Sequence, residues 1–282
     1  MVKIEHKGIL QKLVYKLKSS TDMVYDKNDN KIGLIGQISL EDMEDIEKLI
    51  KRVNKLKEMD TKYLILENLH LFNRENIKRI ENEVDLKILD GINIKSYFLP
   101  IVLKELYLVL GENLGDREIL FFCGDRYITE KFILSISKDT KFITLVGDDE
   151  EIIEDISKTI FEGTGLSIFH CKNIDRILKN YSIIVNLDEN IKMDINKIRK
   201  EAIVFDFSFG KDLQSYGIVD FVFKTDGLNI RENPYIRENM PSYIYEYFNK
   251  IAEGDFIGLI AENQEYSPKK FIDVKIRQNR GL

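Results

Sequence analysis

The second half of the chain alternates short, almost wholly apolar runs with segments of helical periodicity, from residue 115 to about residue 230. Runs of near-continuous Ile, Val, Leu and Phe are typical of strands in a parallel sheet that is covered on both faces. Their strict alternation with helical segments predicts an α/β fold in which this block is a doubly wound parallel sheet. The expected strands are REILFFCG, KFITLVG, LSIFHC, YSIIVNLD, AIVFDFS and VDFVFKT. The side chains expected in the core of the sheet are Phe121, Phe122, Ile143, Leu145, Ile183, Val185, Val204 and Phe205.

The first part of the chain repeats this pattern on a smaller scale. Expected strands at KIGLIGQI, KYLILENL and LKILDG alternate with helical segments, one of them capped by Asn73. A chain of 282 residues suits two domains of about 100 to 150 residues each. The apolar segment IKSYFLPIVLKELYLVLGENL is a natural connecting helix. We therefore expect an N-terminal α/β domain with this helix over residues 1–114 and a Rossmann-like domain over 115–232. Over 233–282 we expect a helix, MPSYIYEYFNKIAEG, that packs back, followed by a polar tail.

Charge and composition exclude several classes of partner. The first 110 residues carry 19 basic and 18 acidic side chains, whereas the rest carry 23 and 30, so no basic face is indicated and nucleic acid is not an expected partner. No apolar run approaches eighteen residues and no signal peptide is recognised, which predicts a cytoplasmic protein without a membrane span. The two cysteines, Cys123 and Cys171, are expected to be reduced.

The stretch REILFFCGDRYITEKFIL has the strand, turn and helix that a dinucleotide-binding fingerprint occupies. In the motif G-x-G-x-x-G, glycines permit a tight turn, let backbone amides reach the pyrophosphate and let the helix approach the strand. Two registers are open. If Gly124 is the first glycine, Arg126 and Thr129 replace the others; if Cys123 takes that place, Asp125 and Ile128 do. Only one glycine remains in the turn in either register, so dinucleotide binding is weakly indicated.

Five further residues are candidates for contact with a cofactor, beside Gly124. Asp125 stands where a helix N-cap belongs, and its carboxylate would use the amides that a pyrophosphate needs, while Arg126 could offset its charge. Asp148 and Asp149 follow the second strand at the spacing of an acid that binds the adenine ribose, although they equally suit a cap and first helical turn. Asn186 ends the fourth expected strand, where a side chain can face a cofactor.

Several segments are similar to one group of two-domain enzymes. In that group one strand ends in Asp before a proline-containing turn, and AIVFDFSFGKDL resembles this segment, although its turn lacks proline. The segments VDFVFKTDGLNIRENP and MPSYIYEYFNKIAEG resemble the group's next strand and its closing helix. LDGINIKSYFLP resembles the Asp-Gly start of the interdomain helix. The chain, over residues 85 to 255, thus resembles the shikimate dehydrogenase and glutamyl-tRNA reductase group, which includes the acyl-carrier-protein reductases. The resemblance implies NAD as cofactor, if any, and Lys95 and Asp90 as the catalytic lysine and acid.

Two hypotheses about function follow. In the first, the protein is a catalytically degenerate Rossmann-like module that binds a protein partner, a second copy of itself or a small nucleotide for regulation. In the alternative, it is an NAD-dependent dehydrogenase or reductase of a small polar metabolite. Residues 1–122 contain no cysteine, which removes a thioester mechanism, and His6, His70 and His170 have no metal-ligand spacing, so no metal site is expected.

Overall fold

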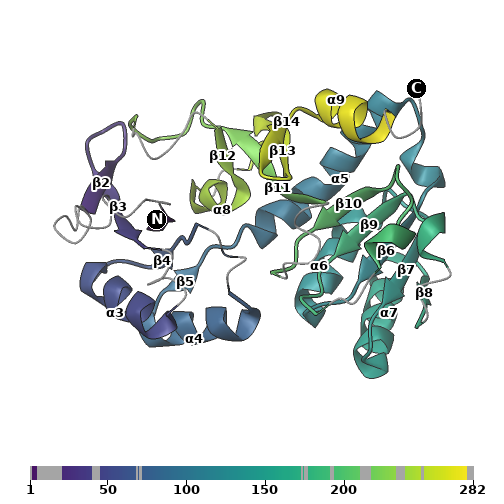
Figure 1. Cartoon of the computed structure of the whole chain (residues 1–282), viewed down its shortest axis with the longest axis horizontal. Coiled ribbons are helices and arrows are strands. Elements are labelled where there is room, and N and C mark those ends of the chain that lie inside the picture. The colour runs from purple at the N-terminus through teal and green to yellow at the C-terminus, as the bar shows by residue number, and fades with distance from the viewer. Residues whose placement is uncertain are drawn as a thin grey trace.

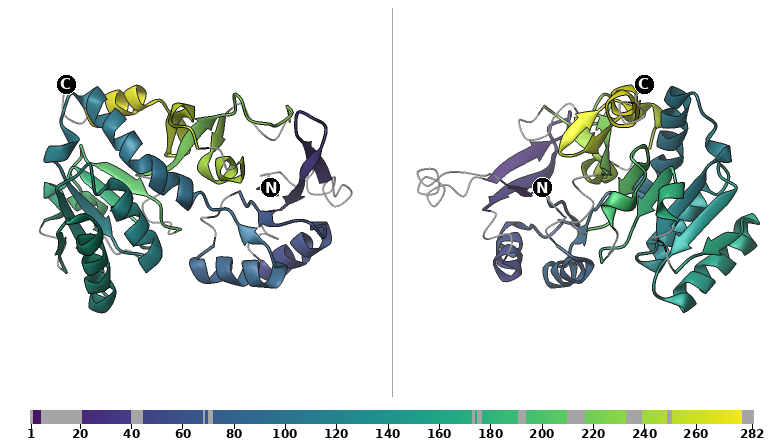
Figure 2. Two further views of the ribbon diagram at one scale, coloured as in Figure 1. Left: turned by 180° about the vertical axis from the view of Figure 1, so that it is seen from behind. Right: turned by 45° about the vertical axis from the view of Figure 1, so that its right-hand side comes forward.

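The computed structural model describes residues 2–4, 21–39, 45–67, 69, 72–172, 174, 177–190, 194–209, 217–232, 239–248 and 251–277. Figure 1 shows a smaller N-terminal lobe beside a larger lobe built around a long sheet, and helix α5 (Ile92–Leu110) runs from one toward the other. The views in Figure 2 agree on this arrangement. The name N-terminal lobe is used below for the described residues up to 88, and sheet lobe for those from 92 onward.

The N-terminal lobe combines small sheets with two helices. Strand β3 lies between β1, which is parallel to it, and β2, which is antiparallel, and β4 pairs with β5. Asp45 caps α3 and Asn73 caps α4, each accepting a bond from a backbone amide of the first turn, and the Asn73 cap confirms the prediction. The bounds are β1 Val2–Ile4, β2 Thr21–Tyr25, β3 Lys31–Ile38, α3 Ile46–Leu56, β4 Tyr63–Leu64, α4 Arg74–Val84 and β5 Lys87–Ile88.

The sheet lobe contains the predicted parallel sheet. Its order is β14-β13-β11-β10-β9-β6-β7-β8, and all neighbours from β11 to β8 are parallel. Counted from β6 as the first strand, the parallel strands follow the order 3-2-1-4-5-6 of a doubly wound Rossmann fold, so the predicted fold class is confirmed. The bounds are β6 Glu118–Phe122, β7 Phe142–Val146, β8 Ile168–His170, β9 Ile183–Asn186, β10 Ile203–Asp206, β11 Ile218–Lys224, β13 Phe256–Ala261 and β14 Gln264–Tyr266.

The two faces of this sheet carry separate apolar clusters. One contains Phe121 and Leu145 and lies with side chains from α5, α6 (Arg126–Ile136) and α7 (Glu150–Thr164). The other contains Phe122 and Val204. All eight predicted core residues are buried, which confirms that set. Among the described helices, none is long and apolar enough to cross a bilayer.

The prediction of two helices on the second face of the sheet is wrong. The described residues of NIDRILKN and MDINKIRK form 3-10 turns, among them η4 (Leu178–Asn180) and η5 (Ile195–Lys197), and no α-helix. In the second segment the Asp194 carboxylate accepts a hydrogen bond from the Asn196 amide at 3.0 Å, a local turn that competes with helix formation. The second face is therefore covered by short 3-10 turns, whereas α5, α6 and α7 cover the first.

The C-terminal region also differs from its prediction. Over its described residues the expected long helix is replaced by β12 (Asn239–Pro241), α8 (Ser242–Tyr245), η6 (Glu246–Phe248) and the start of the 3-10 turn η7 (Glu253–Asp255). Ahead of the expected tail, β13 and β14 form a hairpin through Glu262 and Asn263, both at positive φ. The expected polar tail, the last fifteen or so residues, instead begins with α9 (Pro268–Phe271) and the helical segment Ile272–Arg277, in which Phe271, Ile272 and Ile276 are buried. The limits at residues 114 and 232 stay predictions.

Candidate functional site

The strand order of the sheet reverses between β6 and β9, the place where doubly wound sheets bind their ligands at the carboxyl ends of the strands. Here the two loops that leave these strands are in direct contact. The amide of Leu187 donates to the Phe122 carbonyl at 3.2 Å, and a Cβ added to Gly124 would lie 1.9 Å from the Leu187 carbonyl oxygen. Gly124 is thus required for the approach of the chain's own backbone.

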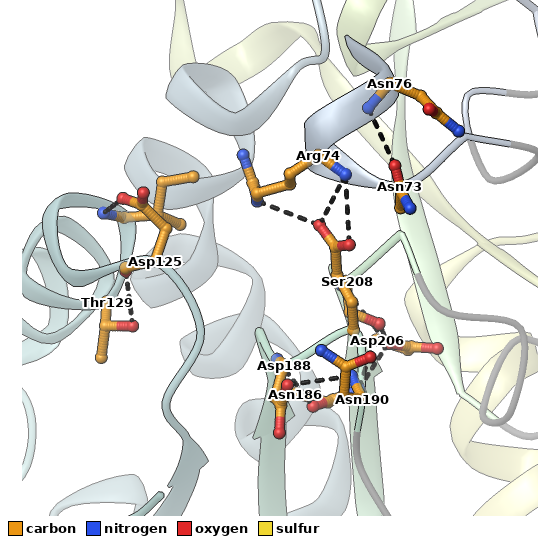
Figure 3. Close-up of polar contacts among 12 residues, drawn as sticks. Asn73, Arg74, Asn76, Asp125, Thr129, Asn186, Asp188, Asn190, Asp206 and Ser208 are labelled. Atoms are coloured by element: carbon orange, nitrogen blue, oxygen red, sulfur yellow. Dashed lines mark hydrogen bonds and ion pairs between the residues drawn. The ribbon is translucent and has the colours of Figure 1, made fainter. Parts of the chain in front are cut away.

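The helix that follows this turn is capped by the turn's own carboxylate. Asp125 Oδ1 accepts from the Ile128 amide at 3.2 Å, and the Asp125 carbonyl accepts from the Thr129 hydroxyl at 2.9 Å (Figure 3). The N-cap predicted for Asp125 is therefore confirmed. Ile128 and Thr129, the residues that replace the last glycine in the two registers, are both buried. Side chains fill the space that a third glycine would leave between helix and strand.

Arg126 is engaged on the surface of the helices. Its guanidinium lies 3.0 Å from Glu130 on α6 and 2.6 Å from Asp155 on α7. The hydrogen bond to Glu130 is the main cause that raises the pKa of Arg126. Two carboxylates therefore already partner the cation that was expected to offset Asp125.

The acids after β7 differ in their engagement. Asp149 caps α7, because its Oδ1 accepts from the Ile152 amide at 3.1 Å. Asp148 is exposed and makes no hydrogen bond with another residue that the structure describes. Both acids predicted for a ribose are exposed, and Asp148 is the one without a hydrogen bond in the described structure.

Asn186 lies at the buried end of β9 and uses its whole amide within the protein. Its Nδ2 donates to Asp206 Oδ1 at 2.9 Å and to Ser208 Oγ at 3.1 Å, and its Oδ1 accepts from the Asp188 amide at 3.0 Å (Figure 3). Ser208 Oγ also donates to Asp206 Oδ1 at 2.7 Å. Asn186 therefore ties the ends of β9 and β10 together.

Asp90 and Lys95 stand at the start of α5 but have different surroundings. Asp90 Oδ1 accepts from the Ile92 amide at 2.9 Å. Gly91 has φ of 77°, and a Cβ there would lie 2.1 Å from Ser242 Oγ on α8, so glycine is needed at this junction. Lys95 is buried one turn further on, with its ammonium 5.5 Å from the centre of the Phe207 ring. Within the described structure no hydrogen bond joins Lys95 to Asp90.

Lys95 instead acts electrostatically on two buried acids, Asp206 at the end of β10 and Asp220 in β11, neither of which was a predicted site residue. Burial is the main cause that raises the pKa of both carboxyls, and the charge of Lys95 opposes it. Asp220 Oδ1 accepts from the Phe221 amide at 2.7 Å, whereas Asp206 Oδ2 has no hydrogen-bond partner in the described structure. An acid inside an apolar strand, as in VDFVFKT, was the signal that could have found this cluster.

The pH dependence of stability should report on Asp206. Burial raises the pKa of Asp206 in the folded protein, so the folded state favours the protonated carboxyl. The stability that Asp206 contributes is therefore complete below the unfolded-state pKa of about 3.9 and is lost as pH rises through the folded-state pKa. Asp206→Asn keeps the Oδ1 acceptor and removes this loss. We expect the variant to gain stability over the unmodified protein as pH rises above about 4. Urea unfolding across pH 4 to 8 measures the difference, with Asp60→Asn at an exposed position as control. A difference that does not grow with pH would contradict the assignment.

A second contact that the sequence did not predict joins the two lobes at this end of the sheet. Both carboxylate oxygens of Glu189, which follows β9, accept from the Arg74 amide at 3.2 and 3.1 Å, and Arg74 Nε lies 3.4 Å from Oε1. Figure 3 shows Arg74 of α4 and its N-cap Asn73 above Asn186, Asp188 and Asp206 of the sheet lobe.

Neither thiol nor metal chemistry is indicated near the turn. Burial, and to a smaller extent the charges of Asp188, Asp149 and Asp125, raise the pKa of the Cys123 thiol, which disfavours the nucleophilic thiolate. The part of the chain that the structure describes holds no group of three His, Cys, Asp or Glu side chains that could bind a metal. The predictions for His6 and His70 lie outside the described residues.

No protein-family model matches the chain, and no curated protein sequence matches it. Solved structures with some likeness include shikimate 5-dehydrogenase from Listeria monocytogenes in complex with shikimate and NAD, with a TM-score of 0.31, 10% identity, and coverage of 62% of this chain and 68% of that one. L-tryptophan dehydrogenase from Nostoc punctiforme has a TM-score of 0.33 and 9% identity, covering 65% and 54%. Anabolic ornithine carbamoyltransferase from Campylobacter jejuni has a TM-score of 0.35 and 12% identity, covering 73% of each. At these TM-scores the likenesses carry no argument about activity.

Proposed function

We propose that this protein is a Rossmann-like binding or regulatory module that does not turn over a dinucleotide. The contact between Gly124 and Leu187 is the observation that carries the proposal. In a dinucleotide site the glycine turn leaves room for a pyrophosphate against backbone amides. In this chain the Leu187 carbonyl oxygen lies against Gly124, 1.9 Å from where a Cβ would be, and the Asp125 carboxylate takes an amide of the helix start.

Electrostatics support the same proposal. Asp125, Asp148, Asp149 and Asp188 follow the strands on either side of the reversal point, while Arg126 is paired elsewhere. One carboxylate about 5 Å from a phosphate charge costs on the order of 3 kcal/mol at an effective dielectric of 20. That energy corresponds to roughly a hundredfold loss of affinity. The partner we propose is a protein, a second copy of the chain, or a small nucleotide bound for regulation without turnover.

The alternative function is an NAD-dependent dehydrogenase or reductase of a small polar metabolite. Two observations favour keeping it: Asp148 is open to solvent after β7, and Lys95 on α5 is buried and acts electrostatically on two buried acids of the sheet. In that case NAD would be the cofactor and Lys95 the group that exchanges a proton with substrate.

Calorimetric titration with NAD, NADH, NADP and NADPH tests the proposal. We expect no micromolar binding by the unmodified protein. We expect Asp125→Gly to bind more tightly, because the substitution frees the Ile128 amide at the helix start and removes a negative charge. The control is Asp45→Gly, which removes the same kind of cap from α3 in the other lobe. Micromolar binding by the unmodified protein that disappears when Asp148 and Asp149 are both changed to Ala would reject the proposal and favour the dehydrogenase.

A further inference from the structure

Glu189 and Phe209, from two different loops of the sheet lobe, hold the same helix of the N-terminal lobe. Glu189 follows β9 and binds the amide and the guanidinium of Arg74, the first residue of α4. The ion pair is well shielded, since the side chains of Arg74 and Glu189 are only 25% and 18% exposed. A shielded carboxylate that accepts one amide with both oxygens and faces a guanidinium is a stronger tie than an exposed pair.

Phe209, which follows β10, strengthens the hold on α4. Its ring lies 4.7 Å from the Arg74 guanidinium carbon, a distance at which a cation and an aromatic face attract. The side chain is buried, and it belongs to the apolar core of the N-terminal lobe, with Phe72 and Ile77. A residue of one lobe thus completes the core of the other.

The N-terminal lobe is also tied on a second side, by different segments. Asn229, beyond β11, exchanges hydrogen bonds with the β2–β3 turn, and the Arg231 amide donates to the Tyr25 carbonyl at 3.0 Å. The Tyr247 hydroxyl donates to the Ile32 carbonyl at 2.9 Å. Breaking the contacts of Glu189 and Phe209 would leave these ties, and the chain connection at Gly91, in place.

We propose that Glu189 and Phe209 form a latch that holds the lobes closed over the carboxyl end of the sheet, with Gly91 and the ties to β2 and β3 acting as the hinge. Release of the latch rotates the N-terminal lobe away and uncovers the ends of β9 and β10. The latch does not depend on whether the protein binds a dinucleotide, because its contacts involve neither Gly124 nor Asp125. Motion about an interface and a few hinge residues is a common form of domain opening.

Distances between spin labels on the two lobes test the latch. Labels at Lys78→Cys on α4 and Lys158→Cys on α7, both exposed positions, are introduced in a background with Cys123→Ser and Cys171→Ser. The unlatched variant is Glu189→Lys, which puts a positive charge beside Arg74. Its control is Glu83→Lys, the same charge change at an ion pair within α4.

We expect a single distance between the two spin labels in the parent and in Glu83→Lys. In Glu189→Lys we expect the main distance between the labels to be longer. Phe209→Ala is expected to add a population with a longer distance between the labels, for an independent reason, the loss of the apolar contact. Should Glu189→Lys fail to fold, Glu189→Gln, which keeps the size of the side chain, is expected to show a minor longer population. Folded Glu189 and Phe209 variants that keep the parent's single distance would overturn the latch.

Discussion

Replacing Lys95 by methionine is expected to lower the free energy of unfolding by about 3 to 5 kcal/mol, because it removes one partner of a buried set of charges. Lys95, Asp206 and Asp220 are all nearly inaccessible to solvent. Methionine retains an unbranched apolar chain of similar length, so the change mainly removes the positive charge. The two carboxyls then lose the charge that opposes the effect of burial on their pKa values.

Urea unfolding at neutral pH measures this change. Lys104→Met on the same helix is the matched control, since Lys104 is 58% exposed and its pair with Asp139 is a surface contact. We expect the control to change stability by no more than about 0.5 kcal/mol. In the double variant with Asp206→Asn, the cost of Lys95→Met should be smaller than in the parent, because one of the stranded acids is gone. Equal costs in both backgrounds would show that Lys95 does not act on Asp206.

The sequence predicted most accurately what depends on neighbours along the chain. The apolar runs located all six parallel strands, and the caps of α4, α6 and α7 followed from Asn73, Asp125 and Asp149 standing just before a helical pattern. The C-terminal hairpin was missed because IGLIA is short and is flanked by acidic residues, and its turn uses Asn263 in place of the usual glycine.

The candidate site was less predictable, since its contacts join residues far apart in sequence. In the sequence, Asp206 looks like an ordinary strand end and Asp220 like an interruption of a strand. Only the fold brings Lys95 of α5 close enough to act on both. Glu189 and Arg74 are separated by 115 positions, and no local pattern pairs them. Gly124 was recognised from the motif, but the motif could not tell whether a phosphate or the chain's own carbonyl approaches it. Only the position of the loop after β9 distinguishes these cases.

Gly124→Ala is expected to destabilise the protein by about 3 kcal/mol or more, because overpacking costs rise when the obstructing atom cannot move freely. The added Cβ would lie 1.9 Å from the Leu187 carbonyl oxygen and 2.7 Å from its carbon, so the backbone after β9 has to shift. That backbone leads through Asp188 to Glu189, and its displacement would also disturb the hydrogen bond from the Asp188 amide to Asn186.

Thermal and urea unfolding of Gly124→Ala should be compared with Gly163→Ala near the end of α7. A Cβ at Gly163 meets nothing within 4 Å, so this control should gain about 0.5 to 1 kcal/mol, the ordinary advantage of alanine over glycine in a helix. If Gly124→Ala proves as stable as the parent, the loop after β9 does not press on the turn after β6. The space beside Gly124 would then be open to a phosphate, and the main structural objection to dinucleotide binding would be removed. A large loss of stability would instead show that this glycine serves the contact between the two loops, whatever ligand the protein binds.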